Sequence, residues 1–277
     1  MPKRVLPQLV MSAKRSVWRM NDHAGEDADR EFQQKRLSVL EACGNECEFC
    51  GHASAKFQEV HHGDDNHANN TRENLFGSCP LCHQVFHLGL AGMRDGGAII
   101  YLPEMSQAEL NQLALLIWII DSTHTLVESK VRNPFKDPKD FQLFKRVHST
   151  SNKIRQMLEN RRAPILMRIA DYIEKTKAMP KELSPKLSDI TPALFASVLM
   201  QLDDGNYAKR ESALGGLRLL PKPARFEQRI VHWRDEANAI LPIPSWTKIL
   251  PEESIRDIVI GCVRSVTEAE QRIATAG

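Results

Sequence analysis

The sequence lacks most features that would mark a secreted, membrane-spanning or repetitive protein. Its longest apolar run, Leu113–Ile120, has eight residues, whereas a helix that crosses a bilayer needs about 20. This run therefore predicts a central buried helix, with a partner-covered helix as the related alternative. No repeat, low-complexity tract or N-terminal apolar leader with a cleavage site is visible. We expect a soluble protein of the reducing cytoplasm with no transmembrane segment.

Net charge is also scarce, at +2 for 277 residues. The small value hides one basic segment, Lys130–Lys186, which has 15 Lys and Arg against 6 Asp and Glu. The segment has helical spacing, so a row of cations could contact DNA phosphates and make binding depend on salt. A solvated helix face, or a surface for an acidic partner, explains the same pattern, because no arginine–aromatic interleaving indicates base stacking. The candidate phosphate contacts are Arg155, Arg161, Arg162 and Arg168.

Cysteine is infrequent, with six in the chain, but four of them form two C-x-x-C pairs. Each pair can place two thiolates on a tight knuckle, and two such pairs complete the tetrahedral shell of a structural zinc ion. We therefore expect zinc at Cys47, Cys50, Cys79 and Cys82. Two disulfides or reduced core thiols are the alternatives. Cys43 and Cys262 match no motif and are expected to be buried thiols.

Histidine is concentrated in the same stretch, with six of ten residues between Cys47 and His87. Lys56–His62 alternates as a short strand does, a polar turn follows, and Pro80–Leu88 can form a helix, which gives a strand–strand–helix order. His83 and His87 stand four residues apart and share one helix face, as ligands of one ion would. The alternative is that the histidines are solvated or hydrogen-bonded residues beside a zinc knuckle. His52 and His67 match no motif position and are expected in loops.

The stretch from Cys47 to His87 resembles the HNH endonucleases in their zinc-ribbon form with a ββα-metal module. Both C-x-x-C pairs, the His-His doublet, an asparagine and H-x-x-x-H occur in the family's order. The resemblance implies that His61, His83 and His87 bind a catalytic divalent ion and that His62 is the general base. It also implies that Asn74 holds the loop and orients His62. Imidazole ligands do not decide among Mg, Mn, Ni and Zn.

A second resemblance extends over most of the chain. The segments Ile100–Leu110, Ser16–Arg19 and Arg218–Trp233 are similar to the IcmJ/DotN family of type IVB (Dot/Icm) secretion systems. That resemblance implies an HNH-like fold with a four-cysteine zinc and a place in the cytoplasmic complex around the coupling-protein ATPase. Members of that family lack the HNH histidines. This sequence retains His61, His62, Asn74, His83 and His87.

The fold class that we expect is α+β, with a zinc-ribbon HNH module followed by a mainly helical region. Four regions are predicted: 1–45, packing on the module; 46–128, the module with a following strand and buried helix; 129–190, the basic segment; and 191–277, a helical region. The expected elements are a strand at Leu9–Met20, a helix near Phe32–Glu41, a strand at Ala98–Leu102, a helix from a Ser106–Glu109 capping box, helices at Asn152–Asn160 and Ile165–Lys177, a connection at Met179–Pro192, a helix capped by Thr191, a turn and helix around Phe226–Ile240, and a last helix from Pro251.

The sequence is compatible with three functions. A secretion component would bind a coupling-protein segment whether or not His62 is intact. A nuclease would hydrolyse DNA phosphodiesters with a divalent ion and would need His62. A DNA-binding adaptor would use Lys130–Lys186 without cutting.

Overall fold

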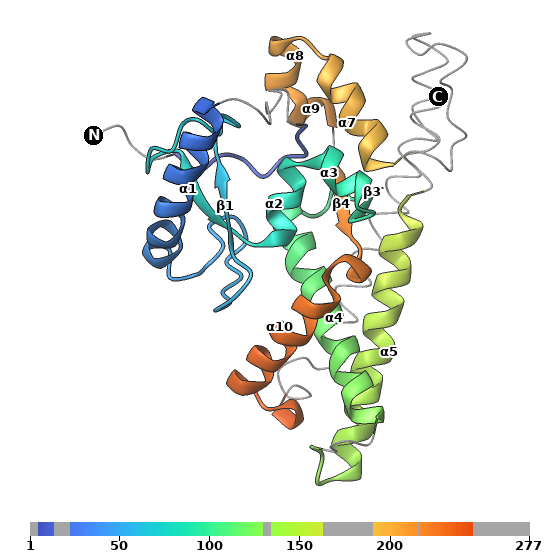
Figure 1. Ribbon diagram of the computed structural model, residues 1–277. Coiled ribbons are helices and arrows are strands. Elements are labelled where there is room, and N and C mark those ends of the chain that lie inside the picture. The colour runs from blue at the N-terminus through green and yellow to red at the C-terminus, as the bar shows by residue number, and fades with distance from the viewer. Residues whose placement is uncertain (1–4, 14–22, 130–133, 163–190, 215, 246–277) are drawn as a thin grey trace, which may run out of the picture.

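The computed structural model describes residues 5–13, 23–129, 134–162, 191–214 and 216–245 (Figure 1). Helices and two small sheets make the described part an α+β structure, as expected. The helix from Pro251, most of Met179–Pro192 and the helix Ile165–Lys177 lie outside the described residues, as do Arg168 and Cys262. The strand expected at Leu9–Met20 is described only as far as Ala13.

The first sheet is an antiparallel hairpin of β1 (Glu59–His62) and β2 (Leu75–Ser78), in which Glu59 pairs with Ser78 and His62 with Leu75. Helix α2 (Pro80–Phe86) follows β2 after one residue, so the expected strand–strand–helix order is present. Proline at the first helical position suits the helix start because its missing N–H is not needed there. The hairpin and α2 together hold most of the residues that the sequence singles out.

Helix α1 (His23–Ala42) covers the hairpin and stands at its outer side in Figure 1. Val39 and Leu40 of α1 pack with Val60 and Leu75 in a small separate core. Chain segments 23–42 and 59–75 thus bury each other's apolar side chains. The predicted helix near Phe32–Glu41 is confirmed.

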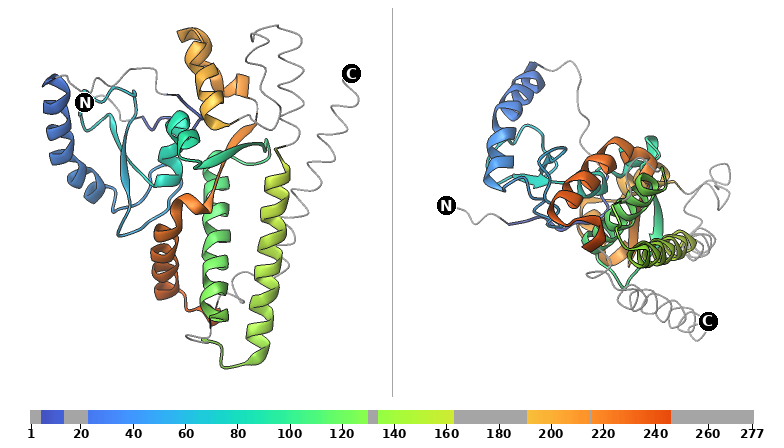
Figure 2. Two further views of the ribbon diagram at one scale, coloured as in Figure 1. Left: turned by 45° about the vertical axis from the view of Figure 1, so that its right-hand side comes forward. Right: turned by 90° about the horizontal axis from the view of Figure 1, so that it is seen from below.

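Helix α4 (Gln107–Glu128) lies at the centre of the helical region, between α5 (Pro138–Asn160) and α10 (Glu227–Ile240) (Figure 2). The Ser106 hydroxyl accepts from the Glu109 N–H while the Glu109 carboxylate accepts from the Ser106 N–H, so the predicted capping box is present. By length and composition α4 is apolar enough to cross a membrane, but most of that stretch is buried inside the fold. The prediction of a central buried helix is confirmed.

The second sheet joins distant parts of the chain. Strand β3 (Gly97–Tyr101) pairs antiparallel with β4 (Leu217–Pro221), with Ile99 opposite Leu219. The sequence predicts β3, but we expected only a turn where β4 lies. Five residues ending in proline give a weak strand signal, and the partner strand is more than a hundred residues away.

The N-terminal segment is a second correction. Residues 5–13 form no strand in the structure, although Leu9–Met20 was expected to be one. The Ser12 N–H donates to the Val85 carbonyl at 3.0 Å and the Ser12 carbonyl accepts from the Leu88 N–H at 3.0 Å. These bonds satisfy the ends of two helices, so the segment pairs with helix termini instead of a sheet.

Short helices complete the described chain. Helix α3 directly follows α2 and packs against α7, which Thr191 caps as predicted. Figure 1 shows α7, α8 and α9 above the hairpin and α2, at the end away from the α4–α5 turn. Their bounds are α3 Leu88–Met93, α7 Pro192–Gln201, α8 Asp204–Ala208, α9 Arg210–Leu214 and the 3₁₀ helix η3 Pro223–Phe226.

Candidate metal centres

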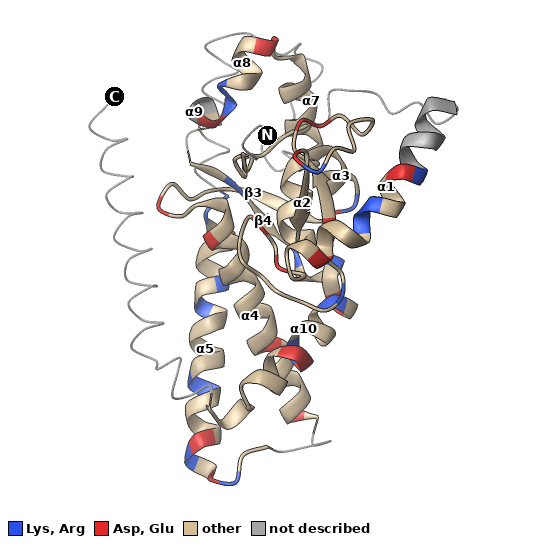
Figure 3. Ribbon diagram, turned by 90° about the vertical axis from the view of Figure 1, so that its left-hand side faces the viewer, with Lys and Arg blue, Asp and Glu red and all other residues tan. Residues whose placement is uncertain are grey.

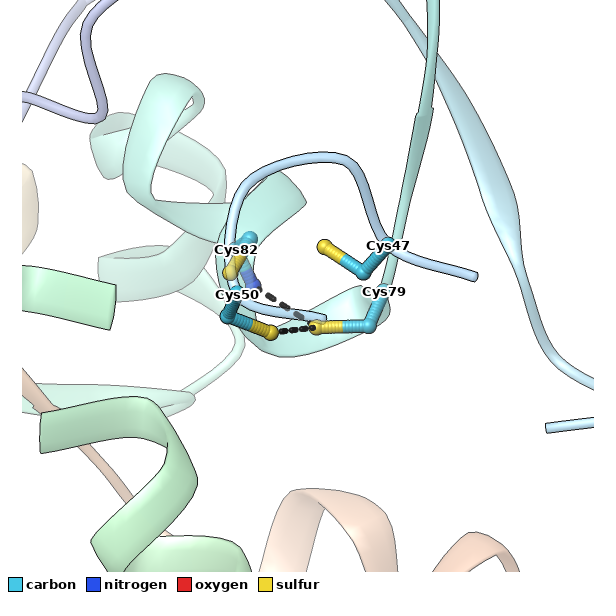
Figure 4. Close-up of side chains that lie close together, drawn as sticks. All are labelled: Cys47, Cys50, Cys79 and Cys82. Atoms are coloured by element: carbon cyan, nitrogen blue, oxygen red, sulfur yellow. Dashed lines mark hydrogen bonds between the residues drawn. The ribbon is translucent and has the colours of Figure 1, made fainter. Parts of the chain in front are cut away.

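The two C-x-x-C pairs meet at one point in the fold, and their sulfurs point toward one another (Figure 4). All four side chains are buried, and the four Sγ atoms lie within 4.8 Å of one another. The Cys50 and Cys79 sulfurs are 3.7 Å apart. Sulfurs on a tetrahedral zinc ion with Zn–S bonds of about 2.3 Å would be about 3.8 Å apart. The group therefore has the size and chemistry to hold a structural metal ion such as zinc.

Local structure at each pair explains how the sulfurs converge. Gly51, at φ +75°, closes the first knuckle, where its N–H donates to the Cys47 carbonyl at 2.8 Å. The second pair caps α2, because the Cys79 sulfur accepts from the Cys82 N–H at 3.5 Å. Burial and the adjacent sulfurs raise the pKa of the Cys79 thiol well above its usual range. A divalent cation would supply the charge that lets these buried thiols ionise.

Helix α4 contacts this cluster directly. The Asn111 side-chain amide donates to the Cys82 sulfur at 3.2 Å, and the Gln112 amide donates to the Cys50 carbonyl. Gln107 then donates to Asn111 at 3.0 Å and exchanges two hydrogen bonds of 2.8 Å with the backbone of Leu219. This buried network joins the cysteine cluster, α4 and β4. Amide donors to metal-bound sulfur are a common way of tuning and orienting such ligands.

Three histidines form a second group of possible metal ligands. His61 on β1, His83 on α2 and His87 just after α2 each bring a ring nitrogen within 4.8 Å of the others. The Nε2 atoms of His83 and His87 are 3.1 Å apart, close to the separation of about 3.3 Å for two nitrogens on a tetrahedral zinc ion. Without an ion, the same distance suits one hydrogen bond between the rings. The grouping matches the ligand set that the HNH resemblance implies.

His61 is prepared to act as a neutral ligand. Its ring is buried and stacks on Phe86 with centroids 3.9 Å apart. Burial, followed by the nearby His83 and His87, lowers the pKa of His61 to about 2. Its buried Nδ1 has no hydrogen-bond partner among the described residues. A buried ring nitrogen without a hydrogen-bond partner is costly. The unpartnered Nδ1 of His61 and the grouping of His61, His83 and His87 therefore fit a site for a metal ion.

Glu59 orients the second ligand, and the sequence reading missed it. One carboxylate oxygen accepts from His83 Nδ1 at 2.5 Å, and the other lies 3.4 Å from Arg229. Burial alone would raise the pKa of Glu59, but the hydrogen bond and charge of His83 and the charges of Arg229 and Arg36 lower it. An ionised carboxylate on Nδ1 leaves Nε2 of His83 to face the ion. The available signal was the two-residue spacing of Glu59 and His61, which places both on one strand face.

His62 faces away from this triad, as strand alternation requires. Its Nε2 lies 2.8 Å from the Asn70 side-chain oxygen, and its ring packs on Phe32 of α1. His67 stacks on His62 with centroids 4.7 Å apart and lies 6.4 Å from His87. His67 lies in the loop after β1, as predicted, and this loop places it beside the site. Asn70 is thus a direct hydrogen-bond partner of His62, and the motif did not identify it.

Asn74 holds the loop that follows β1. Its side-chain oxygen accepts from the Asp64 N–H at 2.9 Å, and its amide donates to the Asp64 carboxylate and the Asn69 carbonyl, both at 2.8 Å. Asp64 also accepts from Asn69 at 2.7 Å. The loop carries His67 and Asn70, so Asn74 positions the two residues that touch His62.

A large cleft lies beside His61. Its volume is about 580 Å³, and His61 and Phe86 line it together with Asp64, Tyr207 and Arg210. Helix α8 and the start of α9 form the opposite wall. His61 therefore borders a cleft with room for a molecule larger than water, although its own side chain is buried.

The structure describes three of the four arginines that are candidates for phosphate contacts, Arg155, Arg161 and Arg162. Figure 3 shows Lys and Arg along α5. Arg155 pairs with Asp121 at 2.9 Å, and Arg161 is buried, with its guanidinium on Glu104 at 3.0 Å. Arg162 is exposed. Arg161 thus holds the end of α5 against the segment before α4. Among the three candidates that the structure describes, Arg162 and the partly exposed Arg155 are accessible to a phosphate, and their contact with DNA stays a prediction.

Comparison with known proteins gives one informative relative. No protein-family model matches the chain. The chain is 24% identical over 232 residues to the type 4 apparatus protein DotN of Legionella pneumophila, an alignment that covers 83% of this chain and 91% of that protein. An alignment of 232 residues is much longer than the stretch from Cys47 to His87, so the similarity is not confined to the metal-binding motifs.

Proposed function

We propose that the protein is a cytoplasmic component of a type IVB secretion system, related to DotN, that binds a segment of the coupling-protein ATPase. The observation that carries this proposal is an alignment spanning most of both chains. The cysteine cluster supports it physically, because Asn111 and Gln112 fix α4 to the cluster. A metal-stabilised core of this kind keeps its outer surface in one shape, as a stable adaptor requires.

Co-purification with the coupling protein of the same system tests this role. Wild-type chain and His62→Ala should both retain the coupling protein at equal yield. His62 is buried, so its side chain does not form part of a docking surface. Cys82→Ser should lose zinc and the complex together. Absence of a complex with folded, zinc-loaded wild-type chain would exclude the adaptor role.

A second candidate function is metal-dependent hydrolysis of DNA phosphodiesters. The observation that favours it is the convergence of His61, His83 and His87, with Glu59 on His83. A bound divalent ion would polarise a phosphate and stabilise its leaving oxygen. The chain's own part is to hold the three rings, keep His61 neutral and hold His62 as the proton acceptor through Asn70. His67, stacked on His62, is a further candidate for moving that proton.

Nicking of supercoiled plasmid tests the second candidate. With magnesium, manganese, nickel or zinc added, wild-type chain should nick, His62→Ala should lose activity by about 100-fold or more, and the four-cysteine zinc should stay. His67→Ala separates the two proton acceptors, since only a residue in the proton path changes the pH profile. No cleavage by wild-type chain with any of the four ions contradicts the nuclease function and leaves the adaptor role unaffected.

A further inference from the structure

A small hollow beside the histidine triad is lined by three arginines from outside the hairpin module. Its volume is about 180 Å³, and His83 and His87 form part of its wall. Arg94 follows α3, Arg225 lies in η3 and Arg229 lies on α10. Residues about 130 positions apart therefore bring positive charge to the edge of one candidate metal site.

Most of this positive charge is not neutralised within the protein. Glu59 is the carboxylate of the lining, and its two oxygens are engaged by His83 and Arg229. Arg94 and Arg225 are exposed, and neither guanidinium has an ion-pair or hydrogen-bond partner among the described residues. Three guanidinium groups against one carboxylate leave an excess of two positive charges. The hollow therefore attracts an anion even before a metal ion is considered.

Size and neighbours favour a phosphate group over other anions. The remaining wall is partly apolar, including Phe226 and Leu90, and a hollow of about 180 Å³ has room for one phosphate group. Guanidinium groups bind tetrahedral phosphate through paired N–H donors. A phosphate oxygen is also a ligand that divalent ions accept beside imidazole. One anion can thus contact arginines and an ion held by the triad.

We infer that Arg94, Arg225 and Arg229 form a phosphate-binding site that completes the histidine centre. The inference rests on the metal site proposed for His61, His83 and His87. In this arrangement the hairpin module supplies the ion, and α3, η3 and α10 supply the anion contacts. Arg229 has a second task, because its contact with Glu59 links phosphate binding to the orientation of His83. The phosphate can come from a free phosphate or from a nucleic-acid diester, which share this chemistry.

The phosphate site is tested by titrating the full, metal-loaded chain with inorganic phosphate at low salt and measuring binding by calorimetry. Arg94→Gln and Arg225→Gln should each weaken phosphate binding by roughly tenfold, and the double variant should abolish it. Lys139→Gln removes the same charge from the first turn of α5, at the far end of the molecule (Figure 1), and should change affinity less than twofold. A short DNA duplex in parallel separates the sources: a nucleic-acid ligand shows the same arginine dependence, whereas a free-phosphate site shows it for phosphate alone.

Metal content measured on the same samples keeps this inference distinct from the metal proposal. The arginine variants should keep every ion that wild-type chain holds. Phosphate bound by wild-type chain and lost in the arginine variants, with no second ion present, would support the anion site and reject the metal site. A second ion with no phosphate binding, or binding unchanged in the double variant, would overturn the anion site alone.

Discussion

At the level of single residues, Glu59 fixes the orientation of His83, one of the three histidines in the triad. It holds His83 through Nδ1 and touches Arg229 with its other oxygen. Carboxylate partners of metal-binding histidines fix the tautomer and raise the basicity of the ligand. The charge on Glu59 is therefore expected to matter more than its hydrogen-bonding shape.

Glu59→Gln tests that expectation, since glutamine retains an oxygen for the His83 N–H and loses the charge. Affinity for the second ion should fall roughly 10–100-fold, while the four-cysteine ion is unaffected. Competition with a chelator of known affinity measures both. An unchanged affinity in Glu59→Gln would mean that Glu59 serves the fold alone.

The spacing of residues in the sequence predicts the candidate metal ligands but not the residues that contact and orient the histidines. The C-x-x-C pairs and the four-residue step from His83 to His87 follow from local geometry, and the structure brings each set together. Asn70 and His67 touch His62 only because the loop after β1 folds back under Asn74. That loop shape depends on side-chain hydrogen bonds that no periodicity encodes.

At the level of elements, helices α3 and α7 pack closely against each other. Two glycines of α3, Gly92 and Gly89, face α7 at different distances and allow a matched comparison. A Cβ added at Gly92 would lie 2.1 Å from the Ala193 nitrogen, so α7 would have to move. A Cβ at Gly89 would meet Ala196 at 3.6 Å, an ordinary contact. Both glycines lie in α3, so helix propensity affects the two positions alike.

Gly92→Ala should lower the free energy of unfolding by about 1–3 kcal/mol, as overpacking does. Gly89→Ala should leave it unchanged or raise it by up to about 1 kcal/mol. Urea unfolding of the two variants beside wild-type chain makes the comparison. Equal stability of the two would show that α7 does not pack on α3 in solution.

The interface of α4 and α5 contains two stacked histidines. His124 stacks on His148 with centroids 3.8 Å apart. Burial, then the neighbouring His148, lowers the pKa of His124 below its usual value. The unfolded chain therefore binds a proton at His124 more readily than the folded chain does. Its stabilising contribution is fully present above about pH 6.5 and decreases as the pH falls below that value.

His124→Phe should remove this pH dependence and keep the ring stack. Between pH 7.5 and pH 5.5, wild-type chain should lose more stability than the variant. Urea unfolding at both pH values with zinc present measures the difference. Parallel loss in both proteins would assign the pH dependence to other groups.

At the level of the whole molecule, parts of the chain that are distant in sequence pack together. Strands β3 and β4 come from the second and fourth of the predicted regions and form one sheet, and α10 packs on α4. The α+β class and the buried α4 could be predicted, because they follow from local patterns. Pairing of β3 with β4, and the meeting of Arg225 with His83 at one hollow, depend on contacts distant in sequence that the residues alone do not reveal.

The central claim is that one chain holds two ions, one in the cysteine cluster and one in the histidine triad. Elemental analysis of purified wild-type chain and of His83→Ala measures this most directly, with circular dichroism to check that the fold is kept. The account predicts two ions per wild-type chain and one per His83→Ala chain. One ion in both proteins would contradict it.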